Sequence, residues 1–353
     1  MLKPSEFLEF TPKRSTKSTY ETALKRYLEI TFETKIRYSE LDKLWINYLK
    51  SKRDINNDFI IFSSVCKNKL SLAPKTLHLY SKIVLMYLKY CGVELTPNAQ
   101  RQLKNFNPKN RPISKEAELT KEKIRIMASS ADTRLRAEIL TAVSSGMRIG
   151  ELLGFKISNI DFSVSPVEIY LFENITKNKT ARKVFISGEA AEALKKWLSV
   201  RENELKRKVA PSDENRCFPY SVSNEISRLK HLLVKTRLYE TDSRTNRATI
   251  HFHMFRKFFL TEFKLAASEE VAEELAGHQG YLSSSYRRIT ASSMKAEYKK
   301  AEPYLTIFND ERCISEKSLC CVYCAELEKE VKGLRTDIKN LMKSISKNSI
   351  VKK

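Results

Sequence analysis

The chain has 353 residues, 42% of them hydrophobic, and a formal net charge of +22 from 64 Lys and Arg against 42 Asp and Glu. This length suffices for two domains and an appendage; no apolar run approaches the ~20 residues of a membrane span and no secretory signal opens the chain, so we expect a cytoplasmic protein. The charge favours a nucleic acid partner over a membrane, because no basic amphipathic anchor stands out; a merely soluble basic protein is the alternative.

The first 106 residues predict a small helical bundle. Apolar residues recur at helical spacing in 14–31, 39–52, 57–70 and 71–93, with short polar connections. We therefore expect an N-terminal helical domain over residues 1–106. Basic residues on its helix surfaces could face DNA or simply be solvated: Lys25, Arg26, Lys50, Lys52 and Arg53.

A polar stretch without periodicity follows the bundle. NPKNRPISKEAEL, at 107–119, carries two prolines, which is typical of an interdomain linker. We place the linker at 107–117 and a second domain at 118–309. Thr120 is the expected N-cap of the first helix of that domain.

The next feature is a buried helix that ends at Ser-Ser-Gly, within LTAVSSGMRIGELLGFKISNIDF at 140–162. Arg148 follows the bend at Gly146-Met147. Glu151 lies three residues later, on the next helical segment. At this spacing the Glu151 carboxylate could hold the Arg148 guanidinium in place.

Two apolar runs around a polar turn, EIYLFENITKNKTARKVFIS at 168–187, predict a β-hairpin. Its turn is strongly basic and carries Lys177, Lys179, Arg182 and Lys183.

The richest stretch is HFHMFRKFFLTEFKLAASEEVAEELAGHQGYLSSSYR, at 251–287. His253 and Arg256 form an H-x-x-R pair that should project from one side of a helix. That helix should bury a face of apolar residues at 255, 258, 259, 263 and 265. A short helix then ends at Gly277, followed by His278 and, eight residues on, by Tyr286.

These residue types suit covalent phosphoryl transfer from DNA to tyrosine. Arginine binds phosphate oxygens through its fixed fork of donors, and histidine binds them or moves a proton near neutral pH. A phenol attacks well where cations stabilise its phenolate. Taken alone, an H-x-x-R pair is more often a surface or capping pair, and a lone tyrosine is more often core or rim.

Four motifs in order make the chain resemble the tyrosine recombinase (integrase) family, the phage-integrase and Xer-like site-specific recombinases. They are S-G-M-R-I-G-E-L-L-G, the hairpin K-T-A-R-K-V-F-I, H-x-x-R, and L-A-G-H before S-S-S-Y. The resemblance covers 118–290 through motifs and 14–110 more loosely. It implies that the two domains close around a DNA duplex.

The resemblance also implies roles for the basic residues. Arg148 and Arg256 match the pair that clamps the scissile phosphate. Lys179 matches the hairpin lysine that protonates the leaving 5′ oxygen. Lys177 is an alternative to Lys179, because hairpin turns slip in register easily.

The remaining matches are two histidines and the nucleophile. His253 and His278 match the flanking acid/base and phosphate-binding positions, and Tyr286 matches the nucleophilic tyrosine. The commoner family spacing places that tyrosine nine residues after the last histidine, against eight here. Tyr281 and Tyr298 are the alternatives.

The C-terminal part carries two further expectations. In the resembling family the segment after the nucleophile, here 292–308, often docks into a neighbouring protomer. Residues 310–353 carry apolar residues at alternating spacings of four and three, typical of a heptad tail that forms a parallel dimer or packs back on the catalytic domain. Four cysteines cluster there: Cys313, Cys320, Cys321 and Cys324. They could bind zinc, form an interchain disulfide or simply pack in the tail.

The expected fold is mainly α with a small β-hairpin or sheet: an N-terminal helical core-binding bundle, a tyrosine-recombinase catalytic domain and a C-terminal coiled-coil-like tail. The expected function is site-specific DNA recombination or integration through a 3′-phosphotyrosyl intermediate, by a tetramer on two DNA sites. We expect no cofactor, since neither a phosphate-binding G-x-x-x-x-G-K-[ST] loop nor an acidic two-metal constellation is present. The alternatives are a type IB topoisomerase-like enzyme and a non-catalytic DNA-binding regulator. A viral or plasmid element is the expected source.

Overall fold

The computed structural model describes residues 2–11, 14–106, 116–205, 215–278 and 289–308. The chain divides into two compact units. The N-terminal unit extends to residue 115 and the C-terminal unit begins at Glu116, with the short segment 241–247 grouped with the former. The predicted linker falls largely outside the described residues, as does the predicted tail over 310–353 with its four cysteines.

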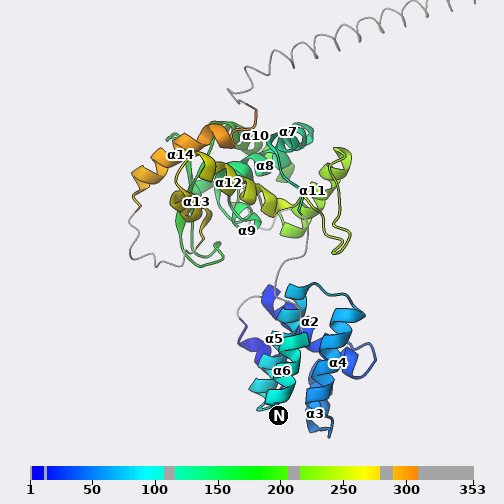
Figure 1. Cartoon of the computed structure of the whole chain (residues 1–353). Helices are drawn as coiled ribbons and strands as arrows, with labels where there is room; N and C mark the ends of the chain where they lie inside the picture. Colours follow the sequence, from blue (N-terminus) through cyan, green and yellow to red (C-terminus); the bar gives the residue numbers. More distant parts are fainter. Residues whose placement is uncertain (1, 12–13, 107–115, 206–214, 279–288, 309–353) are drawn as a thin grey trace, which may run out of the picture. The chain divides into compact units, whose positions relative to one another are not determined.

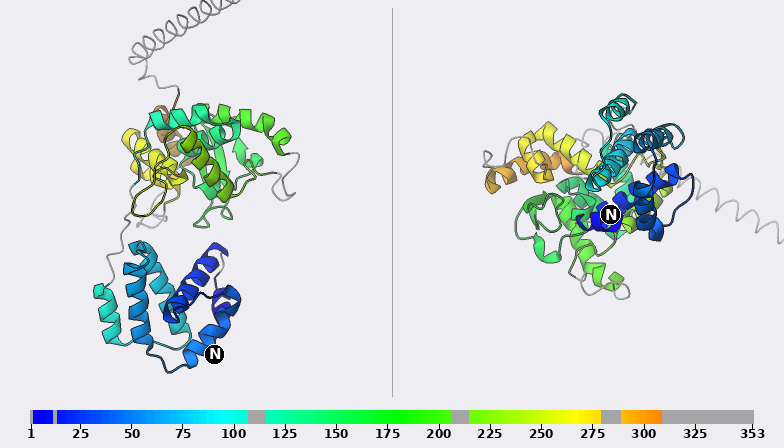
Figure 2. Two further views of the ribbon diagram at one scale, coloured as in Figure 1. Left: turned by 90° about the vertical axis from the view of Figure 1, so that its right-hand side faces the viewer. Right: turned by 90° about the horizontal axis from the view of Figure 1, so that it is seen from below.

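Every α or β element described in the N-terminal unit is a helix (Figures 1 and 2). The six α-helices are α1 (Pro4–Glu9), α2 (Arg14–Thr31), α3 (Leu41–Lys50), α4 (Ile55–Asn68), α5 (Pro74–Tyr90) and α6 (Pro97–Phe106). The four predicted helices are confirmed as α2 to α5, whereas α1 and α6 were not predicted. Both begin at a proline, which is preorganised for the first helical position.

Aromatic residues fill the core of this unit. The ring of Tyr27 stacks on Trp45, with centroids 5.3 Å apart, and the hydroxyls of Tyr27 and Tyr48 are 2.7 Å apart. Tyr48 also donates to the carboxylate of Asp58. Cys66 is fully buried, while Cys91 is only partly buried at the end of α5.

The C-terminal unit is built around α8, whose residues from Ala137 to Ser145 are all buried. The elements that pack most extensively on α8 are α7, α9, α10, α12, α14 and β3; Figure 1 labels the helices among them. The helices are α7 (Lys121–Ser130), α8 (Thr133–Ser145), α9 (Ile149–Leu152), α10 (Gly188–Leu205), α11 (Val222–Lys235), α12 (Phe252–Ala266), α13 (Glu269–Ala276) and α14 (Ala291–Leu305). Thr120 caps α7 as predicted, because its hydroxyl accepts a hydrogen bond from the Lys123 backbone N–H.

The predicted hairpin is confirmed and belongs to a three-stranded antiparallel sheet of order β1-β2-β3. The strands are β1 (Ile160–Asp161), β2 (Val167–Leu171) and β3 (Arg182–Ile186). Leu171 pairs with Arg182 at the end next to the basic turn. Residues opposite each other in a sheet face the same side, so the Arg182 side chain shares the side of the buried Leu171.

Helix α12 buries four of the five apolar positions predicted for it, including Phe255 and Phe259. Leu265 was wrongly included, since it is 71% exposed. It lies two residues beyond the buried Phe263, which turns it about 200° around the helix axis.

Helix α14 packs on α12 and α8 of its own chain, where Tyr298, Ala301 and Leu305 are buried. Docking of 292–308 into a neighbouring protomer therefore stays a prediction. Among the described helices, none is long and apolar enough to cross a membrane.

Candidate functional site

Arg148 is positioned by the bend between α8 and α9. Gly146 ends α8 at φ 64°, and a Cβ on it would overlap the ring of Phe259. Arg148 then caps α9: its backbone N–H donates to Glu151 Oε2 at 2.9 Å and its Nη1 donates to Oε1 at 3.0 Å. The predicted contact between the Glu151 carboxylate and the Arg148 guanidinium is confirmed.

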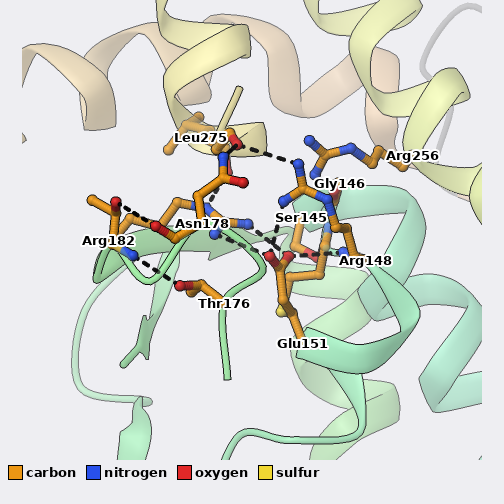
Figure 3. Close-up of polar contacts among 12 residues, drawn as sticks. Ser145, Gly146, Arg148, Glu151, Thr176, Asn178, Arg182, Arg256 and Leu275 are labelled. Carbon is orange, nitrogen blue, oxygen red and sulfur yellow. Dashed lines mark hydrogen bonds and ion pairs between the residues drawn. The ribbon is translucent and has the colours of Figure 1, made fainter. Parts of the chain in front are cut away.

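The Glu151 carboxylate also binds a second arginine (Figure 3). Arg182 Nη2 lies 2.7 Å from Glu151 Oε2 and Arg182 Nη1 lies 3.3 Å from Oε1. Burial raises the pKa of Glu151, but hydrogen bonds and positive charge from Arg182, with the contribution of Arg148, outweigh burial and leave that pKa below its ordinary value. Glu151 is therefore a carboxylate shared by two guanidiniums.

The carbonyl of Gly277 gathers three parts of the site. It accepts hydrogen bonds from Arg148 Nη2 and from Asn178 Nδ2, each at 3.3 Å. Gly277 ends α13 in the left-handed region, at φ 67°, and is followed by His278. The hairpin turn, Arg148 and the start of the His278 segment thus meet at one backbone oxygen.

Arg256 enters the site from α12 and is only 1% exposed. Its Nη1 donates to the Gly146 carbonyl at 2.8 Å, whereas its Nε and Nη2 have no hydrogen-bond partner among the described residues. Burial, followed by the nearby charge of Arg148, lowers the pKa of Arg256 to about 10. The guanidinium is therefore still charged at neutral pH, beside that of Arg148 (Figure 3).

His253 lies three residues before Arg256 on α12, but its side chain is exposed while that of Arg256 is buried. Partial burial lowers the pKa of His253, and the charges of Lys257 and Arg256 lower it further. The imidazole is therefore neutral near pH 7 and can accept a proton.

The two candidate lysines flank Asn178, whose amide reaches the Gly277 carbonyl. Lys177 and Lys179 are both exposed on this turn, and Lys179 has a positive φ of 53°. Their shared turn touches the site, and the choice between them stays open.

His278 is oriented by α13. Its Nδ1 pairs with the Glu273 carboxylate, which also binds Lys264. The contact at Nδ1 leaves Nε2 as the ring nitrogen available to a ligand.

Tyr286 and Tyr281 lie outside the described residues. The other alternative nucleophile, Tyr298, is fully buried and donates its hydroxyl proton to the Ser144 carbonyl at 2.8 Å. Burial also raises the pKa of Tyr298. Tyr298 is therefore a core residue, because a phenol in that position has neither access to DNA nor a stabilised phenolate.

In the sequence, Arg182 stands out only as one of the turn cations, and its place in the site was not predicted. The alternation within β3 could have found it, because Arg182, Val184 and Ile186 share one face of the strand and the last two are fully buried. Nothing in the local sequence marks Glu273 or Asn178. Within the described part of the chain, no cluster of three or more His, Cys, Asp or Glu side chains could hold a metal ion.

Comparison with known sequences identifies relatives. The sequence model of the phage integrase family matches residues 115–286. Tyrosine recombinase XerC of Vibrio cholerae is 27% identical over 210 residues, which are 59% of this chain and 61% of the relative. XerC of Leptospira interrogans is 26% identical over 204 residues, 56% of this chain and 60% of the relative. The chain thus spans about three fifths of the length of these relatives.

Two solved structures show the same fold. A lambda integrase (75–356) dimer bound to a COC′ core site has a TM-score of 0.53 at 14% identity, covering 78% of this chain and 92% of that chain. The XerH site-specific recombinase bound to its difH substrate, in a pre-cleavage complex, has a TM-score of 0.51 at 16% identity, covering 86% of this chain and 78% of that chain.

Proposed function

The chain belongs to the phage integrase family of tyrosine recombinases, and from this premise we propose that it is a site-specific DNA recombinase that cleaves and rejoins DNA through a 3′-phosphotyrosyl intermediate. One observation carries the proposal. Arg256 is buried and charged beside Arg148, with two nitrogens, Nε and Nη2, that have no hydrogen-bond partner among the described residues. A buried cation with open donors is costly without an anion, and the DNA phosphate is the anion that fits.

In the cleavage step the Tyr286 oxygen attacks the scissile phosphorus, and the bond from phosphorus to the 5′ oxygen breaks. Neutral His253 takes the phenol proton. Lys179 gives a proton to the leaving 5′ oxygen, and rejoining reverses both transfers. The phosphotyrosine conserves the bond energy, so no nucleotide hydrolysis is required.

The non-bridging oxygens gain charge as the phosphorane-like transition state forms. Arg148 and Arg256 bind those oxygens, and His278 is the third group of the site that we place at one of them. Donors that are fixed before the reaction stabilise this charge without reorganisation. The shared Glu151 carboxylate and the Gly146 carbonyl fix the two arginines.

The partner we propose is double-stranded DNA, and the active assembly is a tetramer. Recombination of two duplexes cuts four strands, and each chain supplies one nucleophilic tyrosine, so four chains are needed. The net charge of +22 fits a DNA partner. The heptad pattern of the sequence over 310–353 supports self-association.

Covalent capture tests the proposal. Wild type and Tyr286→Phe are incubated with a pool of nicked duplexes that have a randomised core and are then run on denaturing gels; Tyr281→Phe is the matched control. A covalent protein–DNA band in wild type and in the control, but not in Tyr286→Phe, is the expected result.

Captured sequences are then placed on two differently labelled duplexes. Strand exchange between the duplexes supports a recombinase, whereas relaxation of supercoiled DNA without exchange supports a topoisomerase-like enzyme. Tight DNA binding without any covalent band would instead favour the non-catalytic regulator.

A further inference from the structure

Arg182 links three parts of the site that come from distant segments of the chain. It opens β3 at the base of the basic turn. Its Nη atoms bind both oxygens of Glu151, and its Nε donates to the Leu275 carbonyl at 2.9 Å. The side chain is 7% exposed, so this is a buried network and not a surface ion pair.

The fit of Arg182 against α13 is tight. A Cβ on Gly277 would lie 2.8 Å from both Cζ and Nη1 of Arg182, so the guanidinium packs directly against the glycine backbone. The next residue, His278, leaves the helix from this point. The Gly277 carbonyl in turn accepts from Arg148.

The charges explain why an arginine is used here. Glu151 carries one negative charge and is 1% exposed; with Arg148 alone it would form a neutral pair. Arg182 adds a second guanidinium on the same carboxylate, which leaves net positive charge for a phosphate. The fork of Arg182 also fixes the rotation of the carboxylate, which a single ammonium does not.

We propose that Arg182 is a positioning residue for strand cleavage. It acts through Glu151 on Arg148 and through Leu275 and Gly277 on the turn that presents His278, without touching the DNA. This role rests on the proposed recombinase function. Displacement of a catalytic group by about 1 Å lowers a rate by about 10²-fold, which sets the expected size of the effect.

The test compares Arg182→Lys with Arg201→Lys in the full-length protein. Arg201 is a matched control because it is also buried but donates to the backbone carbonyls of Arg216 and Cys217. We measure the rate of covalent complex formation on a nicked duplex under single-turnover conditions, the affinity for the same DNA, and the melting temperature. We expect Arg182→Lys to lower the rate by about 10²-fold with unchanged DNA affinity, and Arg201→Lys to leave the rate of the folded protein unchanged.

A second substrate separates the two routes by which Arg182 could act. A 5′-bridging phosphorothiolate has a sulfur leaving group that needs no protonation, so it should restore cleavage by Lys179→Ala. Arg182→Lys should not be restored, because its contacts lead to Arg148 and to the His278 turn.

Three outcomes would overturn the proposal: a wild-type rate for Arg182→Lys, an equal loss for Arg201→Lys, or full restoration of Arg182→Lys by the sulfur substrate. If wild type itself forms no covalent complex, the recombinase function fails first and the role of Arg182 fails with it.

Discussion

At the scale of single residues, the two arginines of the site, Arg148 and Arg256, differ in how the fold holds their guanidiniums. Arg148 is held by a carboxylate three residues away, whereas Arg256 has one backbone carbonyl as its partner and two nitrogens without a partner among the described residues. Donors without a partner do not offset the cost of burying the Arg256 charge. That charge should therefore lower the free energy of unfolding of the DNA-free protein. Arg256 is thus placed for binding an anion more than for stability.

This imbalance predicts that Arg256→Met separates stability from activity. We expect the free energy of unfolding to stay within about 1 kcal/mol of wild type or to rise, because an uncompensated buried charge is removed. The cleavage rate should fall by about 10²- to 10³-fold with one transition-state donor lost. Urea unfolding and covalent capture measure the two quantities.

Arg201→Met is the control for Arg256→Met, since Arg201 is buried with its donors satisfied by carbonyls. Its loss leaves those carbonyls unpaired and should cost about 1–3 kcal/mol of stability. A larger loss of stability for Arg256→Met than for Arg201→Met would contradict the interpretation.

The depressed pKa of His253 gives a second prediction at this scale. Lys257 lowers that pKa by its charge and also pairs with Glu116, whose charge acts in the opposite direction. Lys257→Gln removes the cation and frees the carboxylate, so both effects raise the pKa of His253. An NMR titration of the five histidines, with His253→Gln to assign the signal, measures it.

If neutral His253 accepts the phenol proton, the acid-side fall of the cleavage rate should move to higher pH in Lys257→Gln. Lys196→Gln, on α10, should change neither the titration nor the rate profile. An unchanged His253 titration in Lys257→Gln would show that burial alone sets the pKa.

Local spacing made part of the site predictable. Arg148 and Glu151 are three residues apart, so their contact follows from helix geometry. Arg182 reaches Glu151 across 31 positions and Leu275 across 93, and such contacts depend on how the hairpin packs on α13. Tyr298 looked like a possible nucleophile only because the sequence does not show that α14 buries it.

At the scale of elements, helical periodicity and the hairpin pattern predicted helices and strands that the structure confirms, because both patterns follow directly from which face of an element is buried. Helix α6 was missed because, over residues 97–104, its buried residues are Ala99 and Leu103, which form a short apolar stripe. Its start depends on Thr96, whose hydroxyl accepts from the Ala99 backbone N–H, a local signal that a search for apolar stripes overlooks.

Helices α8 and α11 are joined by a buried acidic pair that no pattern predicted. Glu138 and Glu225 are both fully buried. Arg134 lies 3.1 Å from Glu225 and 3.7 Å from Glu138. Burial, and next the charge of Glu225, raise the pKa of Glu138 well above its ordinary value, so Glu138 is protonated where free carboxyls are not.

The raised pKa of Glu138 makes the free energy of unfolding depend on pH. Above the ordinary carboxyl pKa the folded protein keeps a proton on Glu138 that the unfolded chain releases, so stability falls as pH rises through this window and stays lower above it. Glu138→Gln cannot titrate. It should be more stable than wild type at pH 8, by about 1 kcal/mol or more, and similar near pH 4.5.

Glu225→Gln is the matched control, because Glu225 is the carboxylate that pairs with Arg134. It should lose about 3 kcal/mol, since removal of one partner leaves a buried charge unpaired. Urea unfolding of both variants at the two pH values decides the assignment. A more stable Glu225→Gln together with a less stable Glu138→Gln would exchange the roles of the two carboxyls.

At the scale of the whole molecule, the dominant quantity is the net charge of +22. Release of counterions makes the logarithm of DNA affinity fall linearly with the logarithm of salt concentration, by about 0.9 per neutralised phosphate. With 6–10 phosphate contacts, affinity should drop by about 10³- to 10⁵-fold between 50 and 200 mM salt. Fluorescence anisotropy with a labelled duplex measures this slope.

The same salt titration also tests whether Arg256 contacts a phosphate. Arg256→Met removes one phosphate contact, so its slope should be shallower by about 0.9. Arg182→Lys should keep the wild-type slope, because Arg182 binds Glu151 and a backbone carbonyl and leaves DNA to other residues. Equal slopes for wild type and Arg256→Met would mean that the open donors of Arg256 do not face a phosphate. Arg148 would then be the one arginine of this pair that binds the scissile phosphate.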